Sequence, residues 1–268
     1  MNQKNYMPIR EFSRLTGIKR ENLRFYDQVG LLCPEVRGEN NYRYYSRRQL
    51  NTAYLVSDLR DLGVSLEEIK RYSSERTPEK MLALFQAQDK HIRAEMERLR
   101  DMREIMRLRS DMAREALERG DDALLIEDKE PEPIFLCPIP APGLTEDESG
   151  ILAYDYAADH GVNLSFPMGV TVPHEGFVPG GGLPPMRYFF RVRRGHNGFR
   201  PGGRYAVGYG RCDVWEAERV YLRLVDFIHA QGLRPHGDVW IEVLLDEMAV
   251  QDTERYCVRM DVRVEPDE

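Results

Sequence analysis

The chain has 268 residues, of which 42% are hydrophobic and 31% charged, and a formal net charge of −7, as expected for a folded protein in water. We expect no membrane span, because no apolar run reaches the roughly 18 residues required, and no signal peptide, because MNQKNYMPIREF lacks an apolar core. Cys33, Cys137, Cys212 and Cys257 form no CxxC motif, which predicts reduced thiols, no metal or other cofactor, and a cytoplasmic location.

Charge is distributed unevenly along the chain. Residues 1–80 carry 15 basic and 11 acidic side chains, whereas residues 121–268 carry 14 basic and 26 acidic ones. The composition therefore favours a polyanion as partner of the first part and a cation as partner of the last part.

The first thirty residues read as two short helices. In MPIREFSRLTG, the residues Ile9, Phe12 and Leu15 recur on one helical face, and Gly17 ends the pattern. A second helix is predicted within IKRENLRFYDQVG. Two short helices joined by LTGI form a candidate helix-turn-helix.

A small β-hairpin and two further helices are predicted next. The segment CPEVRGENNYRYYS combines turn-forming residues with aromatic ones, which is typical of a hairpin. Ser46 with Gln49 and Ser65 with Glu68 have the spacing of a capping box, so a helix is expected to begin at each position.

The longest predicted helix begins at Thr77, with Pro78 at the first helical position and an acidic residue after it. Apolar residues then recur at intervals of seven, at Phe85, Ile92, Leu99, Met106 and Ala113. This repeat indicates a coiled coil. Because no second long helix is predicted, we expect pairing with a second copy in a homodimer. The alternative is a single helix that lies on the C-terminal domain.

The last 135 residues contain an approximate internal repeat of strand, helix, strand and strand. The first copy reads IFLCPI, EDESGILAYDYAADHG, NLSFPMGVTV and MRYFFRVR. The second copy reads GRYAVGYGRC, VWEAERVYLRLVDFIHAQG, DVWIEVLLD and RYCVRMDVRV. Two β-α-β-β units that share one sheet form an α+β domain. The acidic and proline-rich segments before it suit a linker.

Three segments of the N-terminal part, LTGIKRENLRFYDQVGLLCP, NYRYYS and LRDLGVSLEEI, resemble the MerR family of bacterial transcription regulators over about residues 6–72. The resemblance implies a winged helix-turn-helix and a long helix that pairs antiparallel in a homodimer. It also implies that the dimer binds promoter double-stranded DNA with an overlong spacer and distorts it when an effector is bound, so that RNA polymerase engages both promoter elements.

Candidate DNA-binding residues lie on the second helix and on the hairpin, because base reading needs a helix in the major groove and phosphate binding needs cations. They are Lys19, Arg20, Asn22, Arg24, Tyr26, Tyr42, Arg43 and Tyr44. Composition alone fits a solvated basic helix equally well. The resemblance places Arg24 and Tyr26 on the recognition helix and Arg43 on the wing.

The lack of cysteines in one part of the chain argues against a metal ion or an iron–sulfur cluster as the effector. Metal-sensing and iron–sulfur members of the family use cysteines at the start of the dimerisation helix, and this sequence has none between Cys33 and Cys137. The doubled β-α-β-β pattern instead resembles the GyrI-like effector-binding domains of multidrug-sensing relatives. The predicted organisation is a winged helix-turn-helix DNA-binding domain (1–76), a coiled-coil dimerisation helix (77–120), a linker (121–133) and an effector-binding domain (134–268).

Glu242 is the central candidate for ligand binding. It interrupts the apolar run DVWIEVLLDE, where an unpaired carboxylate would cost several kcal/mol. Strand periodicity places it with Trp240 on the face opposite Ile241. We expect other strands to add Phe166, Met168, Tyr188, Phe190, Tyr205 and Tyr209 to this face, and the first helix of the domain to contribute Tyr154 and Tyr156. A carboxylate among aromatic rings predicts a site for lipophilic cations.

Two alternatives for this stretch stay open. Glu242 could pair with an arginine such as Arg191, Arg259 or Arg263, and the aromatic residues could simply form a core. For the whole chain, the favoured function is a ligand-responsive transcription activator without catalysis. The alternatives are a GyrI-like domain that hydrolyses its ligand, although the six histidines form no catalytic pattern, or one that docks a protein partner through the FVPGGGLPP loop.

Overall fold

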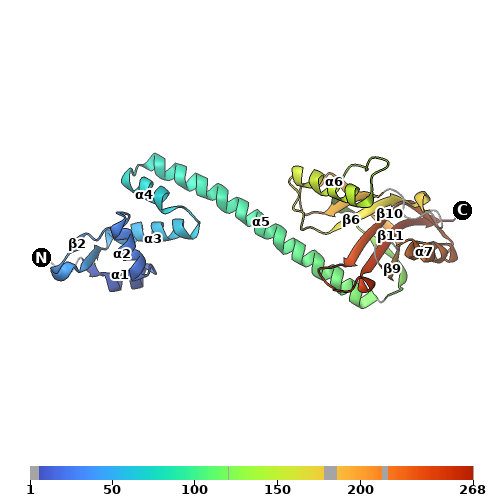
Figure 1. The fold of residues 1–268 in the computed structure, drawn as a ribbon, viewed down its shortest axis with the longest axis horizontal. Coiled ribbons are helices and arrows are strands. Elements are labelled where there is room, and N and C mark those ends of the chain that lie inside the picture. Colours follow the sequence, from blue (N-terminus) through green and yellow to red (C-terminus); the bar gives the residue numbers. More distant parts are fainter. Residues whose placement is uncertain (1–5, 120, 178–185, 213–216, 268) are drawn as a thin grey trace. The chain divides into compact units, whose positions relative to one another are not determined.

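The computed structural model describes residues 6–119, 121–177, 186–212 and 217–267. The chain divides into two compact units, residues 1–97 and 98–268 (Figure 1). Most of the FVPGGGLPP loop and the predicted helix start at 214–216 lie outside the described residues. None of the helices in the described part of the chain has both the length and the hydropathy that a bilayer span requires.

The N-terminal unit contains the predicted helix-turn-helix and wing. Its elements are β1 (Tyr6–Pro8), α1 (Ile9–Thr16), α2 (Arg20–Gln28), β2 (Val36–Arg37), a 3-10 turn (Glu39–Asn41), β3 (Arg43–Ser46), α3 (Arg48–Asp61), α4 (Leu66–Ser74) and the beginning of α5 (Pro78–Arg119). Gly17 ends α1 with a φ of 72°, a left-handed conformation that favours glycine. Phe12 and Leu23 of the two helices are fully buried in one core, which fixes the helix pair.

A small sheet joins the wing to the helix-turn-helix. Its strand order is β1-β3-β2, and both ladders are antiparallel. The hairpin of β2 and β3 was predicted, whereas β1 has only three residues and gives no periodic signal. Tyr45 of β3 is fully buried and stacks on Phe12 with ring centroids 4.3 Å apart, so the wing shares the core of α1.

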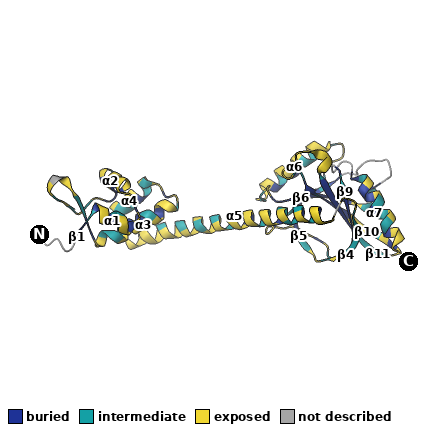
Figure 2. Cartoon of the chain, turned by 90° about the horizontal axis from the view of Figure 1, so that it is seen from below, coloured by how far each residue is buried: buried dark blue, intermediate teal, exposed yellow. Residues whose placement is uncertain are grey.

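Helix α5 begins at the predicted position and runs for 42 residues. The Thr77 hydroxyl accepts a hydrogen bond from the Lys80 amide at 3.2 Å, which satisfies one of the free donors of the first turn. Much of α5 is exposed in the single chain (Figure 2). The exposed residues include the apolar heptad positions Phe85, Leu99 and Met106. The helix therefore carries an apolar stripe without a partner in the described part of this chain.

The C-terminal unit is built on an eight-stranded antiparallel sheet in the order β4-β9-β11-β10-β6-β7-β5-β8. Its elements after α5 are β4 (Leu124–Lys129), β5 (Glu132–Leu136), α6 (Glu146–Asp159), β6 (Met168–Pro173), a 3-10 turn (His174–Gly176), β7 (Arg187–Arg191), β8 (Gly198–Arg200), β9 (Gly203–Arg211), α7 (Glu218–Ala230), β10 (Leu233–Leu245), a 3-10 turn (Thr253–Arg255) and β11 (Cys257–Pro266). The two predicted β-α-β-β repeats are confirmed as β5-α6-β6-β7 and β9-α7-β10-β11.

The predicted linker needs a correction. Residues 124–129 form strand β4, which pairs with β9 at one edge of the sheet. The prediction missed this strand because its polar end, IEDK, continues into the acidic and proline-rich run that resembles a linker. An edge strand tolerates such charges because one of its sides stays open to water.

The two faces of the sheet are covered by different helices. Helices α6 and α7 cover one face with Ala153, Ala157 and Leu224. The last turns of α5 cover the other face, where Met112 and Ala116 pack against residues of several strands. Both faces of β10 are therefore inside the protein, and each faces a different helix.

Candidate functional site

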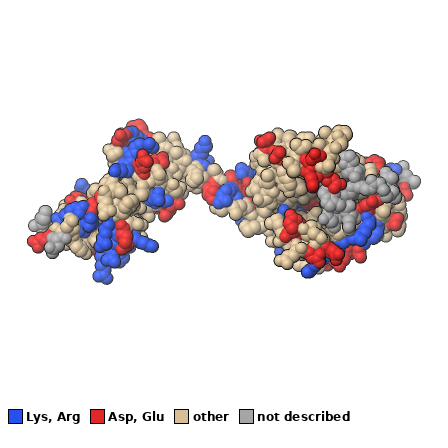
Figure 3. Space-filling view, in the orientation of Figure 1, with Lys and Arg blue, Asp and Glu red and all other residues tan. Residues whose placement is uncertain are grey.

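Helix α2 presents four of the predicted DNA-binding residues to solvent. Lys19 precedes the helix, and Arg20, Asn22 and Arg24 follow on it, all exposed. Lys and Arg side chains gather on this unit (Figure 3). Exposed donors at the start of the second helix of a helix-turn-helix are positioned to reach base edges and phosphates, so their contact with DNA remains a prediction with suitable geometry.

Tyr26 and Arg43 occupy different environments from those expected. Tyr26 is 8% exposed, and its ring belongs to the core of the N-terminal unit. The Nε of Arg43 donates to Asp27 at 2.6 Å, and Nη2 of Arg37 donates to both Asp27 oxygens at 2.8 and 2.7 Å. Two wing arginines therefore hold the buried carboxylate of α2. Sequence reasoning missed Arg37 and Asp27, because their pairing depends on how the wing folds back.

The two remaining wing candidates lie side by side. Tyr42 is exposed and Tyr44 is half-buried, with ring centroids 5.5 Å apart. A Cβ at Gly38 would lie 2.9 Å from the Tyr44 ring, so the glycine makes room for this ring. The wing thus carries a pair of neighbouring tyrosine rings, of which Tyr42 is exposed.

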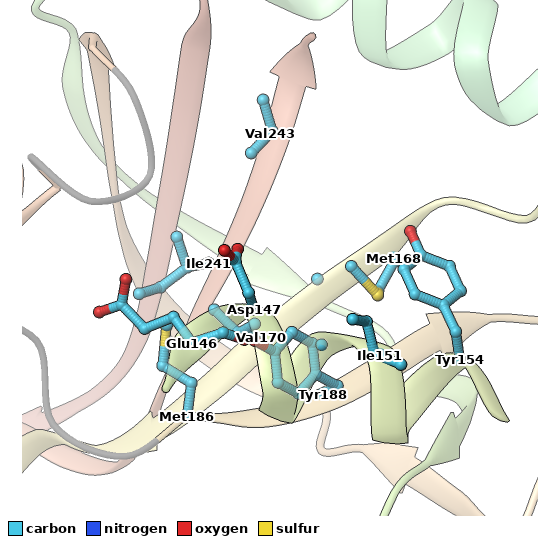
Figure 4. Close-up of a pocket in the computed structure, with 12 residues that line it drawn as sticks. Glu146, Asp147, Ile151, Tyr154, Met168, Val170, Met186, Tyr188, Ile241 and Val243 are labelled. Carbon is cyan, nitrogen blue, oxygen red and sulfur yellow. Dashed lines mark hydrogen bonds between the residues drawn. The ribbon is translucent and has the colours of Figure 1, made fainter. Parts of the chain in front are cut away.

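The C-terminal unit contains a pocket of about 440 Å³ between α6 and the sheet (Figure 4). Ile241 and Val243 of β10 form one wall, and Ile151 and Tyr154 of α6 form another. The complete lining is Glu146, Asp147, Gly150, Ile151, Tyr154, Met168, Gly169, Val170, Met186, Tyr188, Ile241 and Val243. Apolar walls of this size suit a small lipophilic molecule.

The polar groups of this pocket are two carboxylates and two phenols. Glu146 and Asp147 are exposed in the first turn of α6. The Tyr188 hydroxyl donates to the backbone oxygen of Glu146 at 3.2 Å, which ties the ring to the start of the helix. Burial raises the pKa of Tyr154 and Tyr188, so both phenols stay neutral. The pocket therefore offers negative charge and aromatic faces to a bound cation.

Glu242 lies on the opposite face of the sheet and does not line this pocket. Its side chain is 1% exposed and surrounded by arginines. Arg200 donates to Glu242 at 3.1 Å and Arg191 at 3.4 Å, while Arg259 forms a third, very close ion pair. The alternative of arginine pairing is thus the arrangement in the structure, with Arg191, Arg259 and, beyond the prediction, Arg200.

Arg200 occupies the aromatic surroundings that were expected for a ligand. Its Cζ lies 5.4 Å from the centroid of Tyr205 and 5.6 Å from that of Trp240. It pairs with Asp261 as well as with Glu242. A guanidinium between two rings and two carboxylates is a complete cation site, filled here by a side chain of the same domain.

The charges of this cluster compensate one another. Burial alone would raise the pKa of Glu242, but Arg259, Arg191 and Arg200 outweigh burial and hold that pKa far below its usual range. Burial likewise acts against charge on Arg259, and Glu242 with Glu115 outweighs it and raises the pKa of Arg259. Burial, with Arg259 and Arg200 nearby, lowers the pKa of Lys129 to about 7. Because its pKa is so low, the Glu242 carboxylate is ionised, and it is paired with three arginines.

The predicted ligand-binding residues divide between the two faces. Tyr154, Met168 and Tyr188 line the pocket. Phe166 and Phe190 belong to the core beneath α6 and α7, and Tyr156 packs against that core. Tyr205, Tyr209 and Trp240 lie on the face of Glu242. The expectation that these ten residues gather around Glu242 is wrong. Gly169 of β6 and Phe189 of β7 share its face through the ladders, so that Met168, Tyr188 and Phe190 point to the other face. Tyr154 and Tyr156 belong to α6, on the same side as the pocket.

The described residues offer no group of histidine, cysteine and acidic side chains that could hold a metal ion. All four cysteines are thiols and not half-cystines; Cys33 is exposed and the other three are buried. Burial raises the pKa of Cys137 and Cys257 to about 11. These two thiols are protonated and therefore poor metal ligands or nucleophiles at neutral pH.

The fold of the N-terminal unit is that of a class of DNA-binding proteins. A helix pair with a wing and an exposed basic second helix is a winged helix-turn-helix, a DNA-binding fold. A model of the MerR HTH regulatory protein family matches residues 7–76. The HTH-type transcriptional regulator CueR of Salmonella typhi is 32% identical over 108 residues, which cover 35% of this chain and 75% of that protein.

The chain belongs to the MerR family and is a DNA-binding transcription regulator. Over its whole length it is similar to the multidrug-efflux transporter 2 regulator of Bacillus subtilis (strain 168), with 28% identity across 97% of each chain. A cryo-EM structure of an EcmrR–DNA complex covers 97% of this chain and 100% of that chain, with a TM-score of 0.40 and 16% identity.

Proposed function

We propose that this regulator is a homodimer that binds promoter DNA through its winged helix-turn-helix and activates transcription when a lipophilic cation occupies the pocket beneath α6. The pocket itself is the observation that supports the ligand class. Its walls are apolar, two tyrosine rings face it, and Glu146 and Asp147 stand at its edge. Similarity to a multidrug-efflux regulator agrees with a hydrophobic effector.

The proposed site differs from the predicted one in its carboxylates. Glu242 already forms ion pairs with three arginines and is buried away from solvent. Glu146 and Asp147 are exposed and lie on the pocket side of the sheet. Because an ion pair with an incoming cation needs an uncompensated carboxylate, the two residues of α6 are the better candidates for charge selection.

We propose that DNA binding and activation proceed by the mechanism of the MerR family. The exposed stripe on α5 pairs with that of a second copy, so that two winged helix-turn-helix units bind two half-sites. Ligand binding then favours the state that bends and untwists the promoter spacer, at a cost of about 1–6 kcal/mol for smooth bending, and RNA polymerase engages through the DNA. A footprint of the ligand-bound protein should show protection across the spacer.

Two ions of matched shape test the ligand class. Tetraphenylphosphonium and tetraphenylborate have the same size and apolar surface and opposite charge. We expect the full-length protein to bind the cation more tightly, in a fluorescence or calorimetric titration, by about tenfold or more, which corresponds to 1.4 kcal/mol. The double variant Glu146→Gln/Asp147→Asn should reduce that difference.

A matched control removes two carboxylates from the same helix outside the pocket. Asp155 and Asp159 are exposed on α6 and do not line it, so Asp155→Asn/Asp159→Asn should leave the preference unchanged. Equal binding of both ions by the wild-type protein would show simple apolar capture. The proposal includes no catalytic step, and mass spectrometry of the ligand after incubation with the protein should recover it intact.

A further inference from the structure

Strand β10 separates the pocket from helix α5. Ile241 and Val243 line the pocket. Glu242 stands between them in the sequence and points to the other face, because successive residues of a strand alternate. It is buried there. Any displacement of this pocket wall therefore also displaces a carboxylate on the side of α5.

A continuous chain of ion pairs leads from Glu242 to α5. Arg259 of β11 donates to Glu242 through one terminal nitrogen. Its other terminal nitrogen donates to both oxygens of Glu115 on α5, at 2.9 and 2.8 Å. The Tyr209 hydroxyl donates to Glu115 at 2.6 Å. Arg259 thus bridges two carboxylates that belong to different elements.

The surroundings keep this bridge in place. Arg259 is 7% exposed, and charged groups so far from water are costly to separate. A second link joins the end of β10 to α5, because Arg109 donates to Asp246 at 2.6 Å. Met112 of α5 and Trp240 and Leu244 of β10 belong to the same buried cluster. The last turns of α5 and strand β10 are therefore held together by polar and apolar contacts.

We infer that β10 and the bridge Glu242–Arg259–Glu115 transmit the state of the pocket to α5. This inference rests on the proposed effector pocket and assigns the route of its regulation. A molecule that presses on Ile241 and Val243 shifts β10, and Glu242 pulls Arg259 and Glu115 with it. Because α5 is one helix from Pro78 to Arg119, its other end belongs to the N-terminal unit.

Hydrogen exchange of the full-length protein tests the route. Tetraphenylphosphonium should change the exchange of backbone amides around the pocket, in α6 and β6. It should also change the exchange of the α5 amides at 108–119 by about threefold or more, the range expected of such coupling. In Glu115→Gln the pocket response should remain, and the α5 response should fall. Glu118→Gln is the matched control, because Glu118 is exposed on the same helix.

A pocket-filling substitution tests the same route without ligand. In Val243→Phe the added ring enters the pocket and displaces β10, so the α5 amides should respond. The response should be reduced in the double variant Val243→Phe/Glu115→Gln and kept in Val243→Phe/Glu118→Gln. If phenylalanine prevents folding, Val243→Met adds a smaller and more flexible group at the same position.

The outcomes separate the two proposals. No response to tetraphenylphosphonium anywhere, with a Glu115-dependent response of α5 to Val243→Phe, would reject the proposed ligand class and support the route. A response confined to the pocket amides, with ligand and with Val243→Phe, would overturn the route. A response of α5 that is the same in Glu115→Gln and Glu118→Gln would also overturn it.

Discussion

Arg200 donates to Glu242 at 3.1 Å from a position between the rings of Tyr205 and Trp240. The Arg200 guanidinium occupies the cation site that the sequence predicts around Glu242. The guanidinium is buried, and burial lowers the pKa of Arg200, although a guanidinium stays charged at any physiological pH. The face of the sheet toward α5 therefore contains its own cation, and the proposed ligand site is the pocket toward α6.

We expect Arg200→Ala to destabilise the C-terminal unit by about 3–5 kcal/mol, because it leaves Glu242 and Asp261 buried with fewer partners. Ethylguanidinium at millimolar concentration should restore part of this stability by entering the space vacated by the side chain. Thermal unfolding, followed by tryptophan fluorescence, measures both effects. Both tryptophans of the chain, Trp215 and Trp240, lie in residues 98–268.

The control for this variant is Arg234→Ala. Arg234 pairs with Glu265, and its side chain is half-exposed, so its removal should cost less than about 1 kcal/mol. Propylammonium at the same concentration serves as the control additive, because it lacks the planar donors of a guanidinium. A loss below about 1 kcal/mol for Arg200→Ala would contradict the assignment of Arg200 to a buried, essential ion pair.

Glu242 should make stability dependent on pH in the acid range. Its pKa in the folded protein lies far below the value of about 4.3 that an unfolded glutamate has, because the arginines outweigh burial. The folded state therefore binds the proton more weakly, and the stabilisation is complete above about pH 5 and is lost as pH falls through the range below it. Urea unfolding at a series of pH values measures it.

Glu242→Gln removes this dependence. The variant should be less stable than the wild type at pH 7 by about 3 kcal/mol, and the two stabilities should converge as pH falls below about 4. Glu175→Gln is the control, since Glu175 has an exposed side chain on a 3-10 turn. If the difference in free energy of unfolding between wild type and Glu242→Gln stays constant from pH 7 to pH 3, the arginines do not lower the pKa of Glu242.

The order of elements could be predicted because each signal is local. Thr77 and Pro78 mark the start of α5, and Ser65 with Glu68 marks the start of α4, where the Ser65 side chain accepts a hydrogen bond from the Glu68 amide. The alternation of β10 correctly placed Glu242 on the face opposite Ile241. Strand β4 was missed, because an edge strand that ends in charged residues resembles a linker.

The composition of the pocket could not be predicted, because it depends on the register between strands. Gly169 of β6 pairs with Glu242, and directly opposite residues in an antiparallel ladder point to the same face. Met168, one residue away, therefore points to the pocket. Val170 pairs with Tyr188, which brings that ring to the pocket as well. The positions of the aromatic residues in the sequence do not reveal how the strands pair.

The apolar stripe on α5 predicts dimerisation. Leu99 is 53% exposed in the single chain, and we expect Leu99→Asp to weaken the dimer by at least about tenfold, because it places a charge in a coiled-coil seam. Sedimentation equilibrium measures the dissociation constant. Lys90→Asp is the control, since Lys90 is exposed and lies outside the seven-residue repeat of the seam. Unchanged self-association in Leu99→Asp would contradict the proposed pairing.

Arg24 is the residue of α2 that we expect to affect promoter binding most. It is exposed on the second helix, and Arg24→Ala should weaken binding by about tenfold, since one good base contact contributes about 1–3 kcal/mol. Asp27→Asn should also weaken binding, because it releases Arg37 and Arg43 and loosens the wing.

Fluorescence anisotropy with a labelled promoter fragment, repeated at two salt concentrations, separates the two effects. Arg24→Ala should lower affinity for the promoter more than for unrelated DNA, whereas loss of a phosphate contact alone would lower both equally and reduce the salt dependence. Lys90→Ala removes an exposed cation from α5 outside the helix-turn-helix and should leave affinity unchanged. If Lys90→Ala and Arg24→Ala weaken binding to the same extent, α2 is not the helix that reads the promoter.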